Sequence, residues 1–100
     1  MTTKRSKSKT LRQIEKILGG PLTLGLLLRS IREGESWSLA DMGEKLGVTR
    51  AHVAAIENGK PVSPESAARY AKKLGYSADQ FVRFAIQDEL ARVGILYIET

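Results

Sequence analysis

Five short segments of the chain each begin at a serine or threonine and end at a glycine. This pattern of capping residues constrains the fold more than any other feature. The hydroxyl can accept a hydrogen bond from a free N–H of a first helical turn, and glycine readily adopts the conformation that ends a helix. The segments are 23–34, 38–47, 49–59, 63–75 and 77–94. Two of them carry a capping-box pattern, Ser38 with Asp41 and Ser77 with Gln80. The pattern of capping residues predicts five short helices.

Apolar residues recur in these segments at the spacing of one helical face. Leu24, Leu28 and Ile31 follow it in the first segment, and the last segment carries a longer series: Phe81, Val82, Ala85, Ile86, Leu90 and Val93. Amphipathic helices with short connections bury such faces against one another. We therefore predict an all-α fold, a five-helix bundle over residues 22–94, and a length of 100 residues suits a single domain.

The segment before this bundle has two parts. Residues 1–10 are rich in Ser, Thr, Lys and Arg, and we predict a disordered basic arm because they have little apolar surface to bury. Residues 11–20 place four apolar side chains on one helical face, and Gly19-Gly20-Pro21 then ends the pattern. The four are Leu11, Ile14, Ile17 and Leu18. We predict a short N-terminal accessory helix here.

Residues 95–100 form a second short apolar segment. Its apolar residues are Ile95, Leu96, Tyr97 and Ile98. They favour a β-strand but are too few to bury themselves, so we expect them to form a dimer contact between two copies of the chain. The alternative is that this segment folds back onto its own bundle.

Positive charge is concentrated in two places. The formal net charge is +5, and residues 1–20 alone contain six cationic residues and one acidic residue. Residues 45–75 contain six cationic and two acidic residues, whereas residues 21–44 and 76–100 are each net acidic. Basic clusters on an otherwise neutral body are typical of proteins that bind a polyanion such as nucleic acid.

Other functions are disfavoured by what the sequence lacks. It has no cysteine, and His52 is its only histidine, with no nucleophile set, phosphate-binding loop or metal-ligand spacing around it. We therefore expect no enzyme, no cofactor, no metal and no small-molecule substrate. The longest apolar stretch, 22–28, is far short of the roughly 20 residues that span a bilayer, and no secretory signal is evident. We expect a cytoplasmic protein without a membrane partner.

The second and third segments are the most informative pair. They predict two short helices joined by a tight turn at Gly47 and Val48, the arrangement of a helix-turn-helix unit that binds DNA. The outward positions of the later helix are small or basic: Arg50, Ala51, Ala54 and Ala55, with His52 at the edge. Small side chains permit close approach to a major groove, and arginine can bind guanine through two hydrogen bonds. Double-stranded DNA is therefore the expected partner.

The same pair resembles a known family. Residues 42–49 read Met-Gly-Glu-Lys-Leu-Gly-Val-Thr, and residues 56–60 read Ile-Glu-Asn-Gly-Lys before Ser63-Pro64. With this spacing, residues 22–75 resemble the lambda-repressor/Cro-like XRE family of helix-turn-helix proteins. The sequence departs from the family at Leu39, where a phosphate-contacting Gln is common, and at Gly43, where Ala is usual. Because glycine within a helix costs about 0.8–1 kcal/mol relative to alanine, we expect Gly43 to weaken its helix.

The resemblance implies roles for individual residues. Base edges would be contacted by Arg50, Ala51 and Ala55. Phosphates would be contacted by Thr49, His52, Asn58 and Lys60, with Ser38 at the start of the helix that crosses the DNA backbone. Arg32 would pair with Glu57 and support the architecture. Because three outward positions are alanine, we expect the arm to add contacts to phosphates or the minor groove through Lys4, Arg5, Lys7 and Lys9.

These observations predict a sequence-specific DNA-binding transcriptional regulator, a dimeric repressor that reads the major groove with the helix at 49–58. The alternative is an antitoxin-type protein, because XRE-like antitoxins commonly bind a partner toxin and also autoregulate their own promoter. In that case the arm or the accessory helix is a candidate toxin-binding element.

Overall fold

The computed structural model describes residues 22–94, so the predicted arm, accessory helix and C-terminal segment lie outside the described residues. The helices are α2 (Leu24–Gly34), α3 (Leu39–Leu46), α4 (Arg50–Glu57), α5 (Pro64–Leu74) and α6 (Ala78–Arg92). The predicted all-α fold of five helices is confirmed, with no strand in residues 22–94. No helix in that range is long and apolar enough to cross a bilayer.

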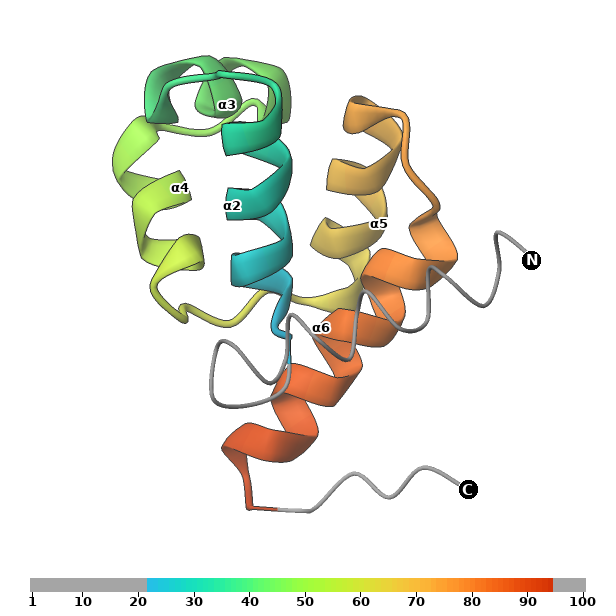
Figure 1. The fold of residues 1–100 in the computed structure, drawn as a ribbon. Helices are drawn as coiled ribbons and strands as arrows, with labels where there is room; N and C mark the ends of the chain where they lie inside the picture. Colours follow the sequence, from blue (N-terminus) through green and yellow to red (C-terminus); the bar gives the residue numbers. More distant parts are fainter. Residues whose placement is uncertain (1–21, 95–100) are drawn as a thin grey trace, which may run out of the picture.

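Helix α2 occupies the middle of the bundle (Figure 1). It packs against α4 on one side and against α6 near its own start, while α3 contacts both α4 and α5. Helix α6 lies beneath the others and makes its most extensive contact with α5. The α3–α4 pair is therefore held at one side of the molecule, away from α6.

Each helix begins at the predicted cap. The hydroxyls of the five cap residues accept hydrogen bonds of 3.0 to 3.3 Å from backbone N–H groups three residues later. At Ser38 the capping box is complete, because the Asp41 carboxylate accepts a 2.9 Å hydrogen bond from the Ser38 N–H. At Ser77 the capping-box prediction was wrong in part: within residues 22–94 Gln80 does not return the bond.

The glycines at the ends of the helices lie in two kinds of position. Gly47 and Gly75 end α3 and α5 in the left-handed conformation, with φ of 78° and 80°. Gly34, in contrast, is the last helical residue of α2, and the left-handed residue beyond it is Ser36, with φ of 61°. The connection from α2 to α3 thus reverses at a serine.

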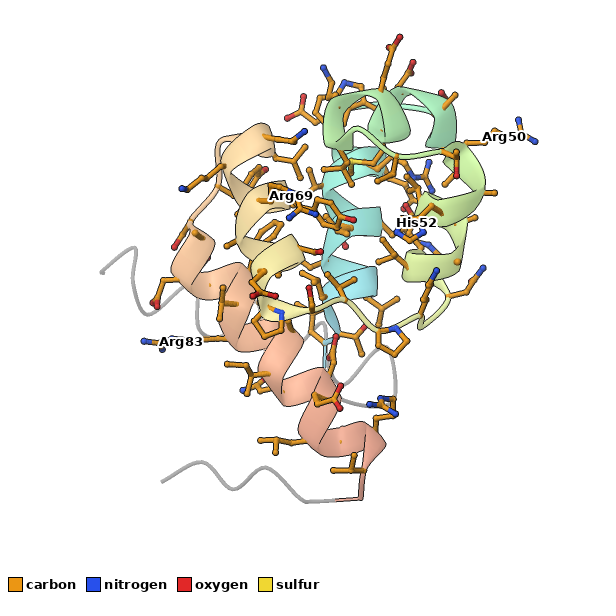
Figure 2. The ribbon with its side chains drawn as sticks, turned by 180° about the vertical axis from the view of Figure 1, so that it is seen from behind. Arg50, His52, Arg69 and Arg83 are labelled. Carbon is orange, nitrogen blue, oxygen red and sulfur yellow. The ribbon has the colours of Figure 1, made fainter. Side chains whose placement is uncertain are left out.

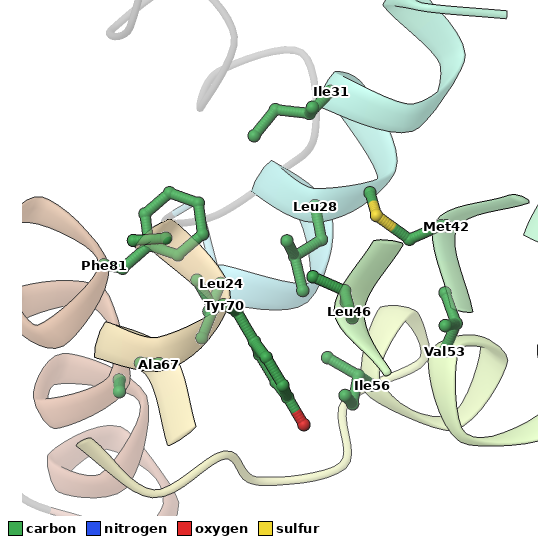
Figure 3. Close-up of a cluster of buried hydrophobic side chains, with 12 residues drawn as sticks. Leu24, Leu28, Ile31, Met42, Leu46, Val53, Ile56, Ala67, Tyr70 and Phe81 are labelled. Atoms are coloured by element: carbon green, nitrogen blue, oxygen red, sulfur yellow. The ribbon is translucent and has the colours of Figure 1, made fainter. Parts of the chain in front are cut away.

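The core lies where α2 faces the other four helices (Figure 3). Its largest fully buried side chains come from α2, α3, α4 and α6: Leu24, Leu28, Met42, Val53, Ile56 and Phe81. Burying one such side chain contributes about 1.5–3 kcal/mol. Because α4 contributes Val53 and Ile56, one whole face of this short helix is anchored.

The predicted apolar face of α6 is buried only in part, and this prediction was wrong for its outer residues. Phe81 and Ala85 are buried, but Ile86 and Val93 remain 45% and 56% exposed. Phe81 and Ile86 are five positions apart, about 140° around a helix of 3.6 residues per turn. Helix α6 is therefore apolar on two sides, and only one of them packs into the core.

Two glycines allow close contacts around α4. A Cβ atom on Gly25 would lie 2.2 Å from the Ile56 carbonyl oxygen, and one on Gly43 would lie 2.6 Å from the Val48 carbonyl oxygen. Both distances are too short for a real contact with backbone. Gly43 therefore has a packing role that the sequence did not indicate, since on this backbone alanine would collide with the turn between α3 and α4.

Candidate nucleic-acid interface

The turn that joins α3 to α4 is closed by the backbone itself. The N–H groups of Gly47 and Val48 both donate to the Gly43 carbonyl, at 2.7 and 2.9 Å. Val48 is half-buried and packs against the core. These contacts fix the direction in which α4 leaves the turn.

Helix α4 is buried on one side and open on the other. Val53 and Ile56 are fully buried, while Arg50 and Ala51 are exposed in the first turn. The other predicted contact positions, His52, Ala54 and Ala55, are half-buried at the edges of the open side. Figure 2 shows Arg50 extending outward at one edge of the molecule, with Arg83 on the opposite side.

The predicted phosphate-contacting residues lie at the ends of α3 and α4. Ser38 and Thr49 are exposed, and each hydroxyl already accepts the capping hydrogen bond, which leaves its own hydrogen free to donate. The first N–H groups of a helix also point outward at its start, where an anion is favoured. Two exposed helix starts with donor hydroxyls are therefore available, and the one at Thr49 directly precedes Arg50.

The other end of α4 carries Asn58 and Lys60, both exposed. The Lys60 Nζ atom lies 3.4 Å from the His52 Nδ1 atom, and the Asn58 side-chain oxygen accepts from Arg29 at 3.4 Å. His52 and Lys60 thus form one polar cluster along the side of α4, from its first turn to the loop that follows it. This cluster and the helix starts flank the small residues in the middle of α4.

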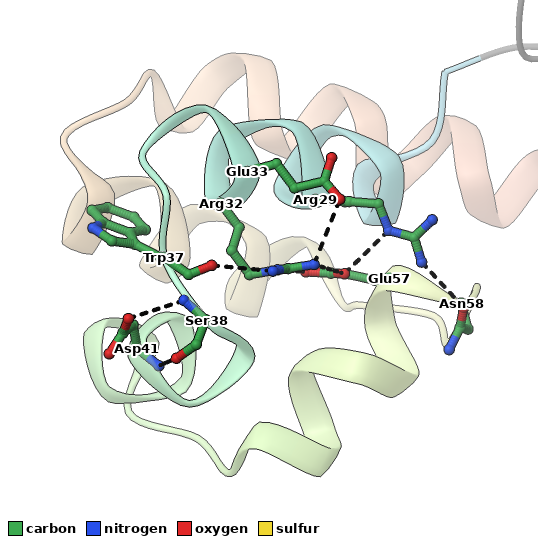
Figure 4. A network of polar contacts seen from close by, with 8 residues as sticks. All are labelled: Arg29, Arg32, Glu33, Trp37, Ser38, Asp41, Glu57 and Asn58. Carbon is green, nitrogen blue, oxygen red and sulfur yellow. Dashed lines mark hydrogen bonds and ion pairs between the residues drawn. The ribbon is translucent and has the colours of Figure 1, made fainter.

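An ion-pair cluster beneath α4 holds its last residue (Figure 4). Arg32 donates to the two oxygens of Glu57 at 2.7 and 3.1 Å, and Arg29 donates to one of them at 3.2 Å. The Glu57 side chain is 2% exposed, against 16% for Arg32 and 41% for Arg29. The hydrogen bond to Glu57 raises the pKa of Arg32 above its ordinary value. The carboxylate is thus buried and bonded by two arginine side chains.

Arg32 and Glu57 were predicted to pair, whereas Arg29 was missed. Its signal is present in the sequence, because Arg29 lies three residues before Arg32 and so shares its face of α2. Arg32 also donates to the Trp37 carbonyl at 3.1 Å, just before the start of α3. The cluster therefore links the end of α4 to α2 and to the approach to α3, and it sets the orientation of α4.

Cations within residues 22–94 divide into two groups by their partners. Arg29, Arg32, Arg83 and Arg92 form ion pairs with carboxylates. In that same range the six cations of residues 45–75 form none: Lys45, Arg50, Lys60, Arg69, Lys72 and Lys73. The stretch that is basic in sequence is therefore also the part of the described chain whose positive charge is left uncompensated.

Lys73 is a further residue of this group that the sequence did not single out. Its Nζ atom would lie 3.1 Å from a Cβ atom on Gly47, so it sits beside the turn between α3 and α4. Arg69 instead lies over the Tyr70 ring of α5, 5.9 Å from its centroid. The basic stretch is thus divided between the α3–α4 pair and the surface of α5.

Several predicted contacts cannot be placed on this surface. The basic arm residues and the dimer contact residues Ile95 to Ile98 lie outside residues 22–94. Among the described residues no three His, Asp or Glu side chains gather closely enough to hold a metal ion.

Comparison with known proteins gives one match. The family model HTH_3, described as helix-turn-helix, matches residues 28–81, which contain all of α3, α4 and α5. No curated protein and no solved structure matches the chain.

Proposed function

We propose that this protein is a sequence-specific repressor that acts as a dimer. The helix-turn-helix family model matches more than half of the chain, so the protein belongs to that family and is of the XRE type. Membership in this family makes it a DNA-binding regulator in general terms. The observation that carries the finer proposal is the open first turn of α4, where Arg50 and Ala51 face solvent while Val53 anchors the helix in the core.

In this proposal Arg50 supplies most of the base discrimination. Its guanidinium can donate to O6 and N7 of one guanine, a contact that discriminates against other bases by about 1–3 kcal/mol. Ala51 and Ala55 can touch thymine methyl groups, and Ala54 lets the helix approach the groove closely. Because alanine offers no hydrogen bond, sequence preference should be strong at the Arg50 position and weaker elsewhere.

Phosphate contacts fix the position of α4 in the groove. Ser38 and Thr49 offer hydroxyl and backbone donors at the helix starts, His52 offers a donor in the first turn of α4, and Asn58 and Lys60 offer donors at its far end. Such contacts carry no sequence information but make affinity depend on salt. The basic arm at residues 1–10 extends this part of the interface, so its removal should flatten the salt dependence of binding.

Two copies of the chain bind DNA together in this proposal. The exposed apolar residues Ile86 of α6 and Val93, which directly follows the helix, support a protein contact there. Val93 also leads into the predicted contact at Ile95 to Ile98. A twofold dimer would read two half-sites about 34 Å apart. Occupancy of such a site within a promoter would block transcription. The proposed location of the protein is the cytoplasm.

The test is selection of bound duplexes from a random pool at physiological salt, for wild type, Arg50→Ala and the control Arg83→Ala. We expect wild type and Arg83→Ala to enrich the same paired half-sites, because Arg83 lies on the opposite side and forms an ion pair with Asp79. Arg50→Ala should lose preference at one position in each half-site. Identical preferences for Arg50→Ala and wild type would contradict readout by Arg50.

The alternative function is that of an antitoxin-type protein that also binds its own promoter. The same exposed residues, Ile86 and Val93, support it, because they would then contact a partner toxin in place of a second copy. Sedimentation distinguishes the two functions. A dimer of the isolated chain at micromolar concentration supports the dimeric repressor, whereas a monomer that pairs only when co-expressed with a neighbouring toxin supports the antitoxin.

A further inference from the structure

A cleft opens where α2 begins, between the loop that follows α4 and the last turns of α6. Its volume is about 270 Å³. Ile56, Pro61 and Ala91 give it apolar walls, and Lys60, Asp88 and Arg92 lie among its lining residues. Small-molecule sites usually measure about 300–1,000 Å³, so this cleft lies at the small end of that range and has room for a few protein side chains.

We propose that this cleft is the docking site of the chain's own residues 11–20, whose apolar face inserts Leu18 against its walls. The chain enters the described domain at this place, because Leu22 is buried and Thr23 lines the cleft. Leu18 lies five residues before Thr23, and five residues span up to roughly 17 Å at 3.3–3.6 Å each. Gly19 and Gly20 lie between them and allow the sharp reversal that docking needs.

Charge favours the same occupant. Glu15 is the single acidic residue of residues 1–20 and lies three positions before Leu18, on the same side of a helix. Lys60 lines the cleft, and among residues 22–94 no carboxylate pairs with it. Glu15 therefore comes near Lys60 when Leu18 is inserted, in a cleft whose charged lining residues are Lys60, Asp88 and Arg92. Arg12 and Lys16 then remain on the outer side of the docked segment.

Docking has a consequence for DNA binding that rests on the proposed function. Lys60 belongs both to the cleft and to the polar cluster at the far end of α4. Insertion of Leu18 into the cleft therefore limits how far residues 1–10 can lie from the proposed phosphate contacts. Tethering the basic arm there raises its effective concentration at the DNA backbone.

The first experiment compares amide NMR spectra of the full chain in wild type, Leu18→Ser and Lys16→Ser, the last being a matched change on the outer side. We expect Leu18→Ser to shift the amide signals of Gly25, Gly59 and Ala91 around the cleft, and Lys16→Ser to leave them in place. Shifts at Ile86 and Val93 instead would place the segment on the outer side of α6 and overturn the proposal, as would no shift at all.

Two further measurements complete the test. Tenfold dilution should leave the cleft signals unchanged, and a concentration-dependent change would assign the occupant to a second copy and overturn docking within one chain. Leu18→Ser should weaken binding to the selected duplex about threefold or more. If Leu18→Ser shifts the amide signals of the cleft but leaves the affinity for DNA unchanged, the proposal that docking holds the basic arm near the DNA backbone is overturned. Absence of DNA binding by wild type would instead overturn the proposed function, while the cleft signals would still report docking.

Discussion

Helices α4 and α6 both present one side to solvent, but the two sides differ in chemistry. On α4 the exposed residues of the first turn are Arg50 and Ala51, one cation and one small side chain. On α6 the exposed residues include Ile86 and Val93, which are large and apolar. Small and basic residues suit a polyanionic groove. Exposed apolar side chains suit a protein contact when they join into a continuous surface. This difference is the reason that we propose DNA as the partner of α4 and a protein as the partner of α6.

The two helices also differ in how they are held. Helix α4 is short and depends on a backbone contact at Gly25 and on the ion-pair cluster at Glu57. Helix α6 is longer and is held by Phe81 and Ala85 in the core and by Asp88, whose carboxylate accepts a 3.0 Å hydrogen bond from the Leu24 N–H. Changes beneath α4 should therefore alter the stability of the whole domain, and changes on the outer side of α6 should alter association alone.

The largest expected effect is that of Gly25→Ala, which removes the close contact of α2 with α4. The added Cβ would lie 2.2 Å from the Ile56 carbonyl oxygen, so backbone must move, and we expect the free energy of unfolding to fall by about 3 kcal/mol or more. Gly34→Ala is the matched control, since nothing lies within 4 Å of its Cβ position, and it should gain about 0.5–1 kcal/mol. Urea denaturation measures both. Equal midpoints for the two variants would contradict the close contact.

Glu57→Gln tests the cluster that holds the end of α4. It leaves Arg32 and Arg29 without their buried carboxylate, and we expect a loss of about 3 kcal/mol in the free energy of unfolding. Glu33→Gln is the control, because that exposed carboxylate lies 4.0 Å from Arg32 and should change stability by less than about 0.5 kcal/mol. Thermal melts that do not separate the two variants would mean that the cluster does not hold α4.

The outer side of α6 is tested by the double variant Ile86→Glu/Val93→Glu. We expect the dimer Kd to rise about 30-fold, an effect of about 2 kcal/mol, while the unfolding free energy of the monomer stays within about 0.5 kcal/mol. Gln80→Glu adds charge to an exposed position on another side of the same helix and should leave the dimer intact. Sedimentation velocity at several concentrations provides the measurement. A double variant that dimerises like wild type would remove α6 from the interface.

The smallest expected effects concern two carboxylates whose pKa values are shifted in opposite directions. Hydrogen bonds from Ser38 lower the pKa of Asp41 below its ordinary value of 3.8, so its stabilisation is present above that pH and is lost as the pH falls through the lowered pKa. Burial raises the pKa of Asp88, in spite of the bond from the Leu24 N–H, so its stabilisation is present below pH 3.8 and is lost as the pH rises through the raised pKa.

The two asparagine variants should therefore respond with opposite sign at neutral pH. Asp41→Asn should lower the Tm, and Asp88→Asn should raise it slightly, because its amide oxygen can still accept from the Leu24 N–H. Below pH 3.8 both differences from wild type should shrink. Melting curves between pH 2 and pH 7 test this, and shifts of the same sign at pH 7 would show that the environments of the two carboxylates do not differ in this way.

Much of the α3–α4 unit could be predicted from sequence because its determinants are local. The hydroxyls of Ser38 and Thr49 bond to N–H groups only three residues away, within one helical turn. The left-handed turn at Gly47 needs only the residue that adopts it most readily. The exposure of Arg50 likewise follows from the helical period once Val53 and Ile56 face the core. Interactions that close within one turn depend little on the rest of the chain.

Other features were decided by the tertiary structure alone. Arg29 meets Glu57 across 28 positions of sequence, and Gly25 meets the Ile56 carbonyl across a helix contact that no local pattern records. Helix α6 carries apolar residues on two sides, so its period is compatible with burial of either one. Packing against α5 and α2 selects the side of Phe81 and leaves Ile86 in solvent. Sequence thus determined where the helices begin and end and which side of α4 is open, whereas the choice of partners between distant helices required the packed core, because those contacts form only when the helices meet.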